Sequence, residues 1–271
     1  MCRGYFVPIT EHKDNPEEDE SLRKFLSGGA EIAGGAVGGA IGFLAGGPVG
    51  ATVAGAASVA AAKALTAVGK EVSDRLLGPR EAVRVGGVLA LASDEIARRI
   101  EQGETLRSDG FFDAVVGQRS NAEEVAESVL LKSQREPEEH KLIYMGKLLS
   151  NASFNAEISA ALAHHLIKAG EELTYRQLCL LSLAARKRAS LRSSNYRGQS
   201  HFDMELYQVL YELFHLYQKG YLNFGGSVAF GPTDVIPGSM EVQGIGADLY
   251  NEMGLSRIPE AEFMPLIKVL K

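Results

Sequence analysis

The chain has 271 residues, which is long for one compact domain, so two structural units are the starting expectation. With 45% hydrophobic and 23% charged residues it is neither a disordered chain nor a coiled-coil rod, and its net charge of −6 disfavours a protein that coats nucleic acid. Two cysteines without a C-x-x-C pair exclude a disulfide scaffold and point to a reducing compartment. Residues 1–26 form a polar, acidic N-terminal segment without the pattern of a secretory signal, so we expect a cytoplasmic protein, or one at the inner membrane facing the cytosol.

The next segment, residues 27–76, is rich in glycine: 11 of the 30 glycines fall within residues 28–62. No charged residue occurs between positions 32 and 62, and the sequence Gly-Gly-Pro at 46–48 divides this run into two halves. Because Gly-Pro favours a turn and proline suits a first helical position, the segment predicts a helical hairpin. A single kinked helix is the alternative.

Small residues recur at every fourth position through this segment, which would align them on one line of a helix. Such a stripe, a glycine zipper, lets another helix approach to backbone contact. It therefore predicts that the hairpin self-associates and that the protein is a homo-oligomer. The predicted helix-packing residues are Gly34, Gly38, Gly42, Gly46, Gly50, Ala54 and Ser58.

Membrane lipids are the expected partner of the hairpin. Arg23 and Lys24 precede the uncharged run and Lys63 and Lys70 follow it, as in a segment whose two ends stay in the cytosol. A limb of about 15 residues spans only about 23 Å, less than the hydrocarbon core of about 30 Å. Insertion into the membrane and burial in a soluble core both stay open, although glycine's cost of about 1 kcal/mol per helix position in water favours the membrane.

Residues 77–172 predict a helical domain. Apolar residues recur there at helical spacing, and Ser120 with Glu123 has the pattern of a capping box at a helix start. Further helices are expected after Pro137 and from Asn155. The region between the glycine-rich segment and the last hundred residues is therefore almost wholly helical.

Residues 173–271 have a different pattern. Amphipathic helices are predicted at 173–188 and 203–220, and the sequence YLNFGGSVAFG at 221–231 predicts a β-hairpin around a Gly-Gly turn. Two short helices follow. The order helix, helix, strand, strand, helix is winged-helix-like, so the expected fold class is mainly α with a small α+β module at the C-terminus. We expect this module to contact a protein partner.

Basic residues concentrate at the start of this module, because six Arg or Lys and no Asp or Glu lie between Glu172 and Asp203. They form either a solvated helix end or a contact for phosphate, lipid headgroups or nucleic acid. The helix predicted at 203–220 lacks base-reading arginine and asparagine, which disfavours sequence-specific DNA binding. The candidate anion-binding residues are Arg186, Lys187, Arg188, Arg192 and Arg197.

Motifs of catalysis are missing from the sequence. It contains no phosphate-binding glycine motif, no nucleophile elbow and no histidines at i and i+4, so we predict no catalytic residue, no metal and no cofactor. Asp234 and Glu241 imitate the acidic pair of a metal-dependent nuclease, but the prolines between them predict a loop. A nucleic-acid-associated enzyme is thus the third hypothesis on function.

Three segments resemble the C-terminal half of bacterial abortive-infection alpha-type proteins: LIYMGKLLSNASFN at 142–155, LTYRQLCLLSLA at 173–184 and VQGIGADLYNEMGL at 242–255. The resemblance covers about half of the chain and includes no catalytic motif, and the glycine zipper departs from the family's usual pattern. It implies defence against phage through growth arrest or death of the infected cell.

Together these patterns predict a membrane-associated effector of bacterial phage defence, abortive-infection or toxin-like, whose glycine-zipper hairpin oligomerises and perturbs the membrane. The alternative is a soluble interaction or scaffold protein in which the hairpin is buried core.

Overall fold

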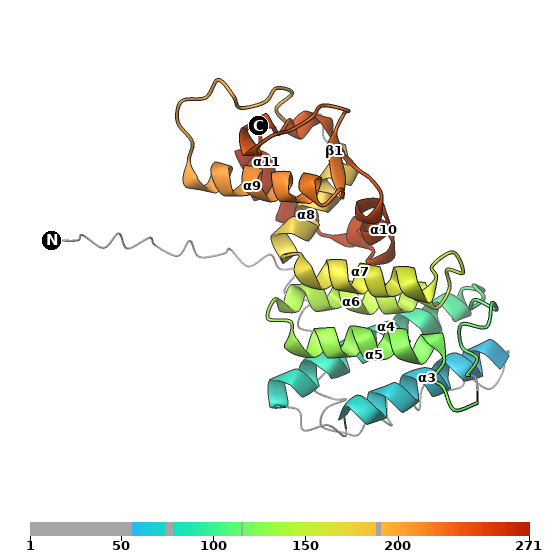
Figure 1. The fold of residues 1–271 in the computed structure, drawn as a ribbon. Coiled ribbons are helices and arrows are strands. Elements are labelled where there is room, and N and C mark those ends of the chain that lie inside the picture. Colours follow the sequence, from blue (N-terminus) through green and yellow to red (C-terminus); the bar gives the residue numbers. More distant parts are fainter. Residues whose placement is uncertain (1–55, 74–77, 115, 188–190) are drawn as a thin grey trace.

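A computed structural model describes residues 56–73, 78–114, 116–187 and 191–271. This part of the chain is mainly helical, with one small two-stranded sheet, as the sequence predicts (Figure 1). The acidic segment 1–26 and the uncharged run up to residue 55 lie outside the described residues. The predicted hairpin turn, and the choice between a hairpin and a kinked helix, therefore stay predictions.

Five helices lie side by side in a bundle, and α10 of the C-terminal module packs against two of them, α6 and α7 (Figure 1). The bundle helices are α3 (Ala56–Ser73), α4 (Pro79–Glu101), α5 (Asn121–Arg135), α6 (Glu139–Ala152) and α7 (Ala160–Glu172).

Two of these helices begin at side-chain caps. The Ser120 hydroxyl accepts a hydrogen bond from the backbone N–H of Glu123 at 3.2 Å, and the Glu123 carboxylate accepts one from the Ser120 N–H at 2.7 Å. The predicted capping box is confirmed. α7 begins later than the sequence predicted, at Ala160 instead of Asn155, because the Ser159 hydroxyl caps it by accepting from the Leu162 N–H at 3.1 Å.

α3 belongs to the bundle. It packs mainly on α5 and buries Leu65, Val68 and Val72, each of which is at most 4% exposed. Fully burying a Val or Leu side chain contributes about 1.5–3 kcal/mol. The C-terminal part of the segment predicted as a hairpin, residues 56–73, is therefore a helix of the folded bundle.

α6 is the central helix. It contacts α4, α5, α7 and α10, and its residues are buried on all sides. Gly146 allows the close approach of α4, since a Cβ at this position would lie 2.7 Å from the Cδ2 atom of Leu91.

The C-terminal module follows α7 in the chain. It consists of α8 (Tyr175–Ala185), α9 (Met204–Gln218), β1 (Leu222–Phe224), the 3-10 turns η1 (Pro232–Asp234) and η2 (Pro237–Ser239), β2 (Met240–Val242), α10 (Ile245–Glu252), η3 (Leu255–Arg257) and α11 (Glu260–Val269).

The predicted β-hairpin within residues 221–231 is wrong. β1 pairs antiparallel with β2, in the register Leu222 with Val242, and only an isolated bridge to Ser227 follows the Gly-Gly turn. The backbone N–H groups of the predicted second strand bind side chains instead. The N–H of Ala229 donates to the Tyr217 hydroxyl at 3.4 Å, and that of Phe230 donates to the Asp234 carboxylate at 2.8 Å.

The start of α10 lies directly against the chain before β1. A Cβ on Gly246 would lie 1.9 Å from the carbonyl oxygen of Tyr221, which already accepts a hydrogen bond from Gln243. Backbone on both sides leaves no room for a side chain at this position.

We expect Gly246→Ala to destabilise the protein by about 1–3 kcal/mol or more, since overpacking against backbone cannot be relieved by a rotamer change. The matched control is Gly198→Ala, where nothing lies within 4 Å of the new Cβ. Chemical denaturation measures both variants. Equal stability of the Gly246 variant and the wild type would contradict this packing.

Candidate functional site

The glycine-zipper residues lie outside the described part of the chain, except Ser58, which falls within α3. Among the described residues, no helix combines the length and the apolar character that crossing a membrane requires.

The basic run is distributed over the C-terminal module, and its described members have partners within the module. Arg186 donates to the carbonyls of Ser256 and Ile258 at 2.7 and 2.8 Å, while Lys187 pairs with Glu241 at 2.7 Å. Arg192 donates to the carbonyl of Asn195 at 3.0 Å and stacks on the Tyr196 ring. Arg188 lies outside the described residues, and the anion-binding role of the run stays a prediction.

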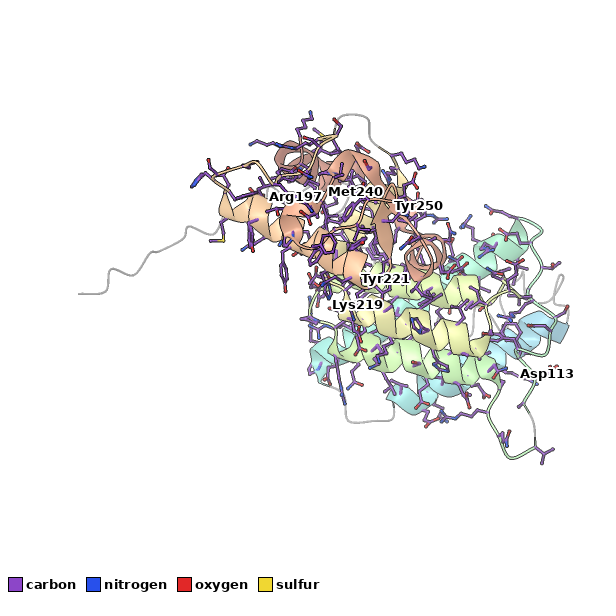
Figure 2. The ribbon with its side chains drawn as sticks, turned by 45° about the horizontal axis from the view of Figure 1, so that its top comes forward. Asp113, Arg197, Lys219, Tyr221, Met240 and Tyr250 are labelled. Carbon is purple, nitrogen blue, oxygen red and sulfur yellow. The ribbon has the colours of Figure 1, made fainter. Side chains whose placement is uncertain are left out.

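Arg197 and Asp234 form the most strongly coupled pair of this group. Arg197 lies in the C-terminal module (Figure 2). Its Nε atom donates to the Asp234 carboxylate at 2.5 Å, and this hydrogen bond lowers the pKa of Asp234 to about 2. The second carboxylate of the nuclease hypothesis, Glu241, pairs with Lys187. Each carboxylate thus has its own cation, and the described residues contain no group of three potential metal ligands.

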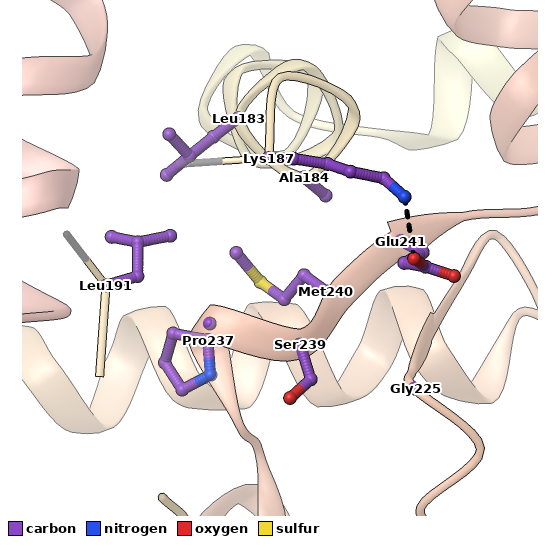
Figure 3. A pocket seen from close by; sticks show the side chains of 10 residues that line it. Leu183, Ala184, Lys187, Leu191, Gly225, Pro237, Ser239, Met240 and Glu241 are labelled. Carbon is purple, nitrogen blue, oxygen red and sulfur yellow. Dashed lines mark hydrogen bonds and ion pairs between the residues drawn. The ribbon is translucent and has the colours of Figure 1, made fainter. Parts of the chain in front are cut away.

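A cavity of about 260 Å³ lies between the end of α8 and β2 (Figure 3). Its wall is largely apolar, with Leu183, Leu191 and Met240, and the Lys187–Glu241 ion pair lies at its edge. Lys187 follows the end of α8 with φ of 46°, the only positive φ of a non-glycine residue in the described part of the chain. This left-handed conformation directs the ammonium towards β2.

The three segments that resemble the abortive-infection proteins meet at one place, the junction between the bundle and the C-terminal module. The side chain of Asn151 on α6 donates to the carbonyl of Glu252 at the end of α10, at 2.8 Å. The Ser182 hydroxyl on α8 donates to the carbonyl of Leu255 at 2.8 Å. These two polar contacts tie α6 and α8 to the same short stretch of chain.

A charged residue of α4 extends this junction. The guanidinium of Arg99 donates to the Asn151 side-chain oxygen at 2.9 Å and lies over the ring of Phe154. Asn155 donates to the Glu252 carboxylate at 3.0 Å. Because both amides have fixed partners, they orient α6 relative to α10. At the opposite end of α7, Lys219 pairs with Glu172 at 2.9 Å (Figure 2).

Comparisons with known proteins find no similar protein: no family model, no curated protein and no solved structure matches the chain.

Sequence reasoning missed the junction as a site. Asn151 and Asn155 lie about a hundred residues before Glu252 in the chain, and Asn151 and Glu252 are ordinary polar residues near helix ends. The only available signal was that all of them fall within segments of the family resemblance.

Glu252 makes the junction sensitive to pH. Burial raises the pKa of its carboxyl above the ordinary value of 4.5, with Asp248 adding to the rise, while the Asn155 hydrogen bond opposes it. The folded state thus binds this proton more tightly than the unfolded state does. The resulting stabilisation is complete below about pH 4.5 and is lost as the pH rises through the folded-state pKa.

We expect Glu252→Gln to raise the free energy of unfolding at pH 7 and to leave it unchanged at pH 4.5, because Gln keeps the oxygen that accepts from Asn155. Denaturant titrations at both pH values measure this. Glu101→Gln on the exposed end of α4 is the control and should show no such difference. An equal effect of both variants would show that burial of Glu252 is not the cause.

Proposed function

We propose that the protein is a membrane-associated effector, of the abortive-infection or toxin-like kind found in bacterial phage defence. Its glycine-rich segment self-associates and perturbs the membrane. The helical bundle and the C-terminal module stay on the cytosolic side, where they hold and control this segment. The observation that carries the proposal is the uncharged, glycine-striped run that leads directly into a bundle helix, α3.

The position of α3 in the bundle limits how the glycine-rich run can insert into a membrane. Since residues 56–73 are packed in the bundle, the uncharged run outside it is reduced to residues 32–55. A second hairpin limb from Pro48 would then have only eight residues, or about 12 Å of helix, whereas all 24 residues as one helix would span about 36 Å. Insertion therefore requires either one long segment or the release of α3 from α5.

The C-terminal module is the proposed control element. We propose that it is a winged-helix-like module that contacts a protein partner, and the order α8, α9, β1, β2, α10 supports this proposal. Its α9 carries exposed apolar side chains, among them Met204, Tyr207 and Tyr211 at 73, 46 and 59% exposure. Aromatic and methionine side chains are enriched at protein interfaces, which supports this role.

The second candidate function is a soluble scaffold protein, and α3 favours it. Leu65, Val68 and Val72 are buried on α5, so part of the segment predicted as a hairpin belongs to the core of the helical bundle, which supports this alternative. In this case the glycine run would pack on protein and not on lipid.

Membrane fractionation of the full chain tests the proposal against this alternative. We expect the protein to sediment with membranes and to be released only by detergent, because the run of residues 32–55 has no charge. Complete recovery as a soluble monomer would contradict the effector proposal and support the scaffold.

Self-association through the glycine stripe has its own test. Each close helix contact contributes on the order of 1 kcal/mol, so the double variant Gly42→Leu with Gly46→Leu should reduce crosslinked oligomers several-fold. Phe43→Leu, off the stripe, is the matched control and should leave the yield unchanged. If the double variant crosslinks as well as the wild type, the stripe is not the contact.

A further inference from the structure

Lys147 is the most unusual charged residue of the described structure. It lies on the central helix α6 with 9% of its surface exposed, and it forms no hydrogen bond or ion pair with any described residue. Its stem is buried, but its Nζ atom is not among the fully buried atoms that lack a partner, so the ammonium itself is accessible to a ligand. Lysine is almost never buried in this way unless it is paired. The same helix supplies the comparison: Lys141, 2% exposed, pairs with Glu136 at 2.5 Å and donates to the carbonyl of Glu171 at 3.1 Å.

The stem of Lys147 is held against η3 of the C-terminal module. A Cβ on Gly254 would lie 3.0 Å from its Cδ atom, so the lysine stem packs closely against the backbone at this position. Gly254 also has a φ of +64°, a conformation that other residues rarely adopt. The lysine is therefore fixed at the boundary between the bundle and the module.

The charged neighbours of Lys147 are mostly cations. Arg98 on α4 and Arg257 on η3 both donate to Oε1 of Glu95, at 2.7 and 3.1 Å. Of the three charged groups that act on Lys147, two are cations and one is a carboxylate, so positive charge is in excess around its ammonium. Burial and Arg257 lower the pKa of the Lys147 ammonium, and Arg98 lowers it further, while Glu95 opposes them.

Hydrogen-bond donors remain available at this place. The Lys147 ammonium has three unused N–H groups, and among the described contacts Arg257 uses only Nη2. Arg98 is more fully engaged, because its Nη1 atom also donates to Gln102 at 2.9 Å. These free donors come from α6 and η3. What they lack is a negatively charged acceptor.

We propose that the junction of α4, α6 and η3 is a binding site for a phosphate monoester or free phosphate, held by Lys147 and Arg257. A phosphoryl group brings about two negative charges and several strong acceptor oxygens, which offsets the excess charge and occupies the free donors. Glu95 is a positioning residue, since it orients both arginines. The bound group connects the bundle to the C-terminal module. This proposal is independent of membrane insertion.

The experiment measures phosphate binding by the full chain, by calorimetry and by the thermal midpoint at constant ionic strength. We expect the midpoint to rise with phosphate and not with chloride. Lys147→Met keeps the stem but removes the charge. It should weaken binding at least tenfold and raise the midpoint in phosphate-free buffer, because the repulsion of the ammonium by Arg257 and Arg98 is removed. Lys168→Met, 74% exposed on α7, is the matched control and should bind as the wild type does.

Two sources of the phosphoryl group are distinguished by the choice of ligand. Glycerol phosphate represents a soluble ligand, and vesicles with phosphatidic acid represent a lipid headgroup. Binding that depends on Lys147 in either arm supports the site and identifies its source. The proposal is overturned if neither arm depends on Lys147, or if the wild-type midpoint follows ionic strength alone.

Discussion

The fold depends on the burial of α6. Most of its residues lie between α4, α5, α7 and α10, so a polar residue on it costs stability unless it finds a partner inside the protein. The Ser150 hydroxyl is buried without one among the described residues. Lys141 has Glu136, and Asn151 has both Arg99 and Glu252. Because the partners of Asn151 come from α4 and α10, satisfying one side chain fixes the C-terminal module on the bundle. Lys147, on the same helix, is left without such a partner among the described residues.

Local sequence signals predicted the helices correctly. They failed where residues distant in the chain compete for the same backbone hydrogen bonds. The predicted capping box at Ser120 acts within four residues, and its helix begins where this cap lies. The Gly-Gly turn after β1 is equally local and does form, with positive φ at both glycines. The strand expected after it does not form, because Tyr217 and Asp234 take its N–H groups and β2 takes the edge of β1.

The order of charged residues along the chain is the poorest guide to the folded structure, because it does not show where net charge lies. The run from Arg176 to Arg197 has no carboxylate within it, yet its described members meet Glu212, Glu241, Glu260 and Asp234, which lie 36 to 74 residues away. The reverse holds at Lys147, which has the sequence pattern of an ordinary helix-surface lysine. Its excess of positive charge arises only when α4 and η3 pack beside α6. A count of charges along the chain therefore predicts a basic surface at the run from Arg176 to Arg197, where ion pairs exist. It misses the cluster of cations around Lys147.

The same central helix connects the two ends of the chain. α3 continues from the glycine-rich run and rests on α5, α5 packs on α6, and α6 carries the junction with α10 and η3. Any event that moves the C-terminal module must break or re-form the contacts of Asn151 and Lys147 with that module. The glycine run is attached to the other side of this stack through the apolar face of α3. The proposed phosphate would lie between α4, α6 and η3, where it would offset the excess positive charge around Lys147. α4, which carries Glu95 and Arg98 of this site, also contacts α3, so a single helix separates the proposed site from the helix that continues the glycine-rich run.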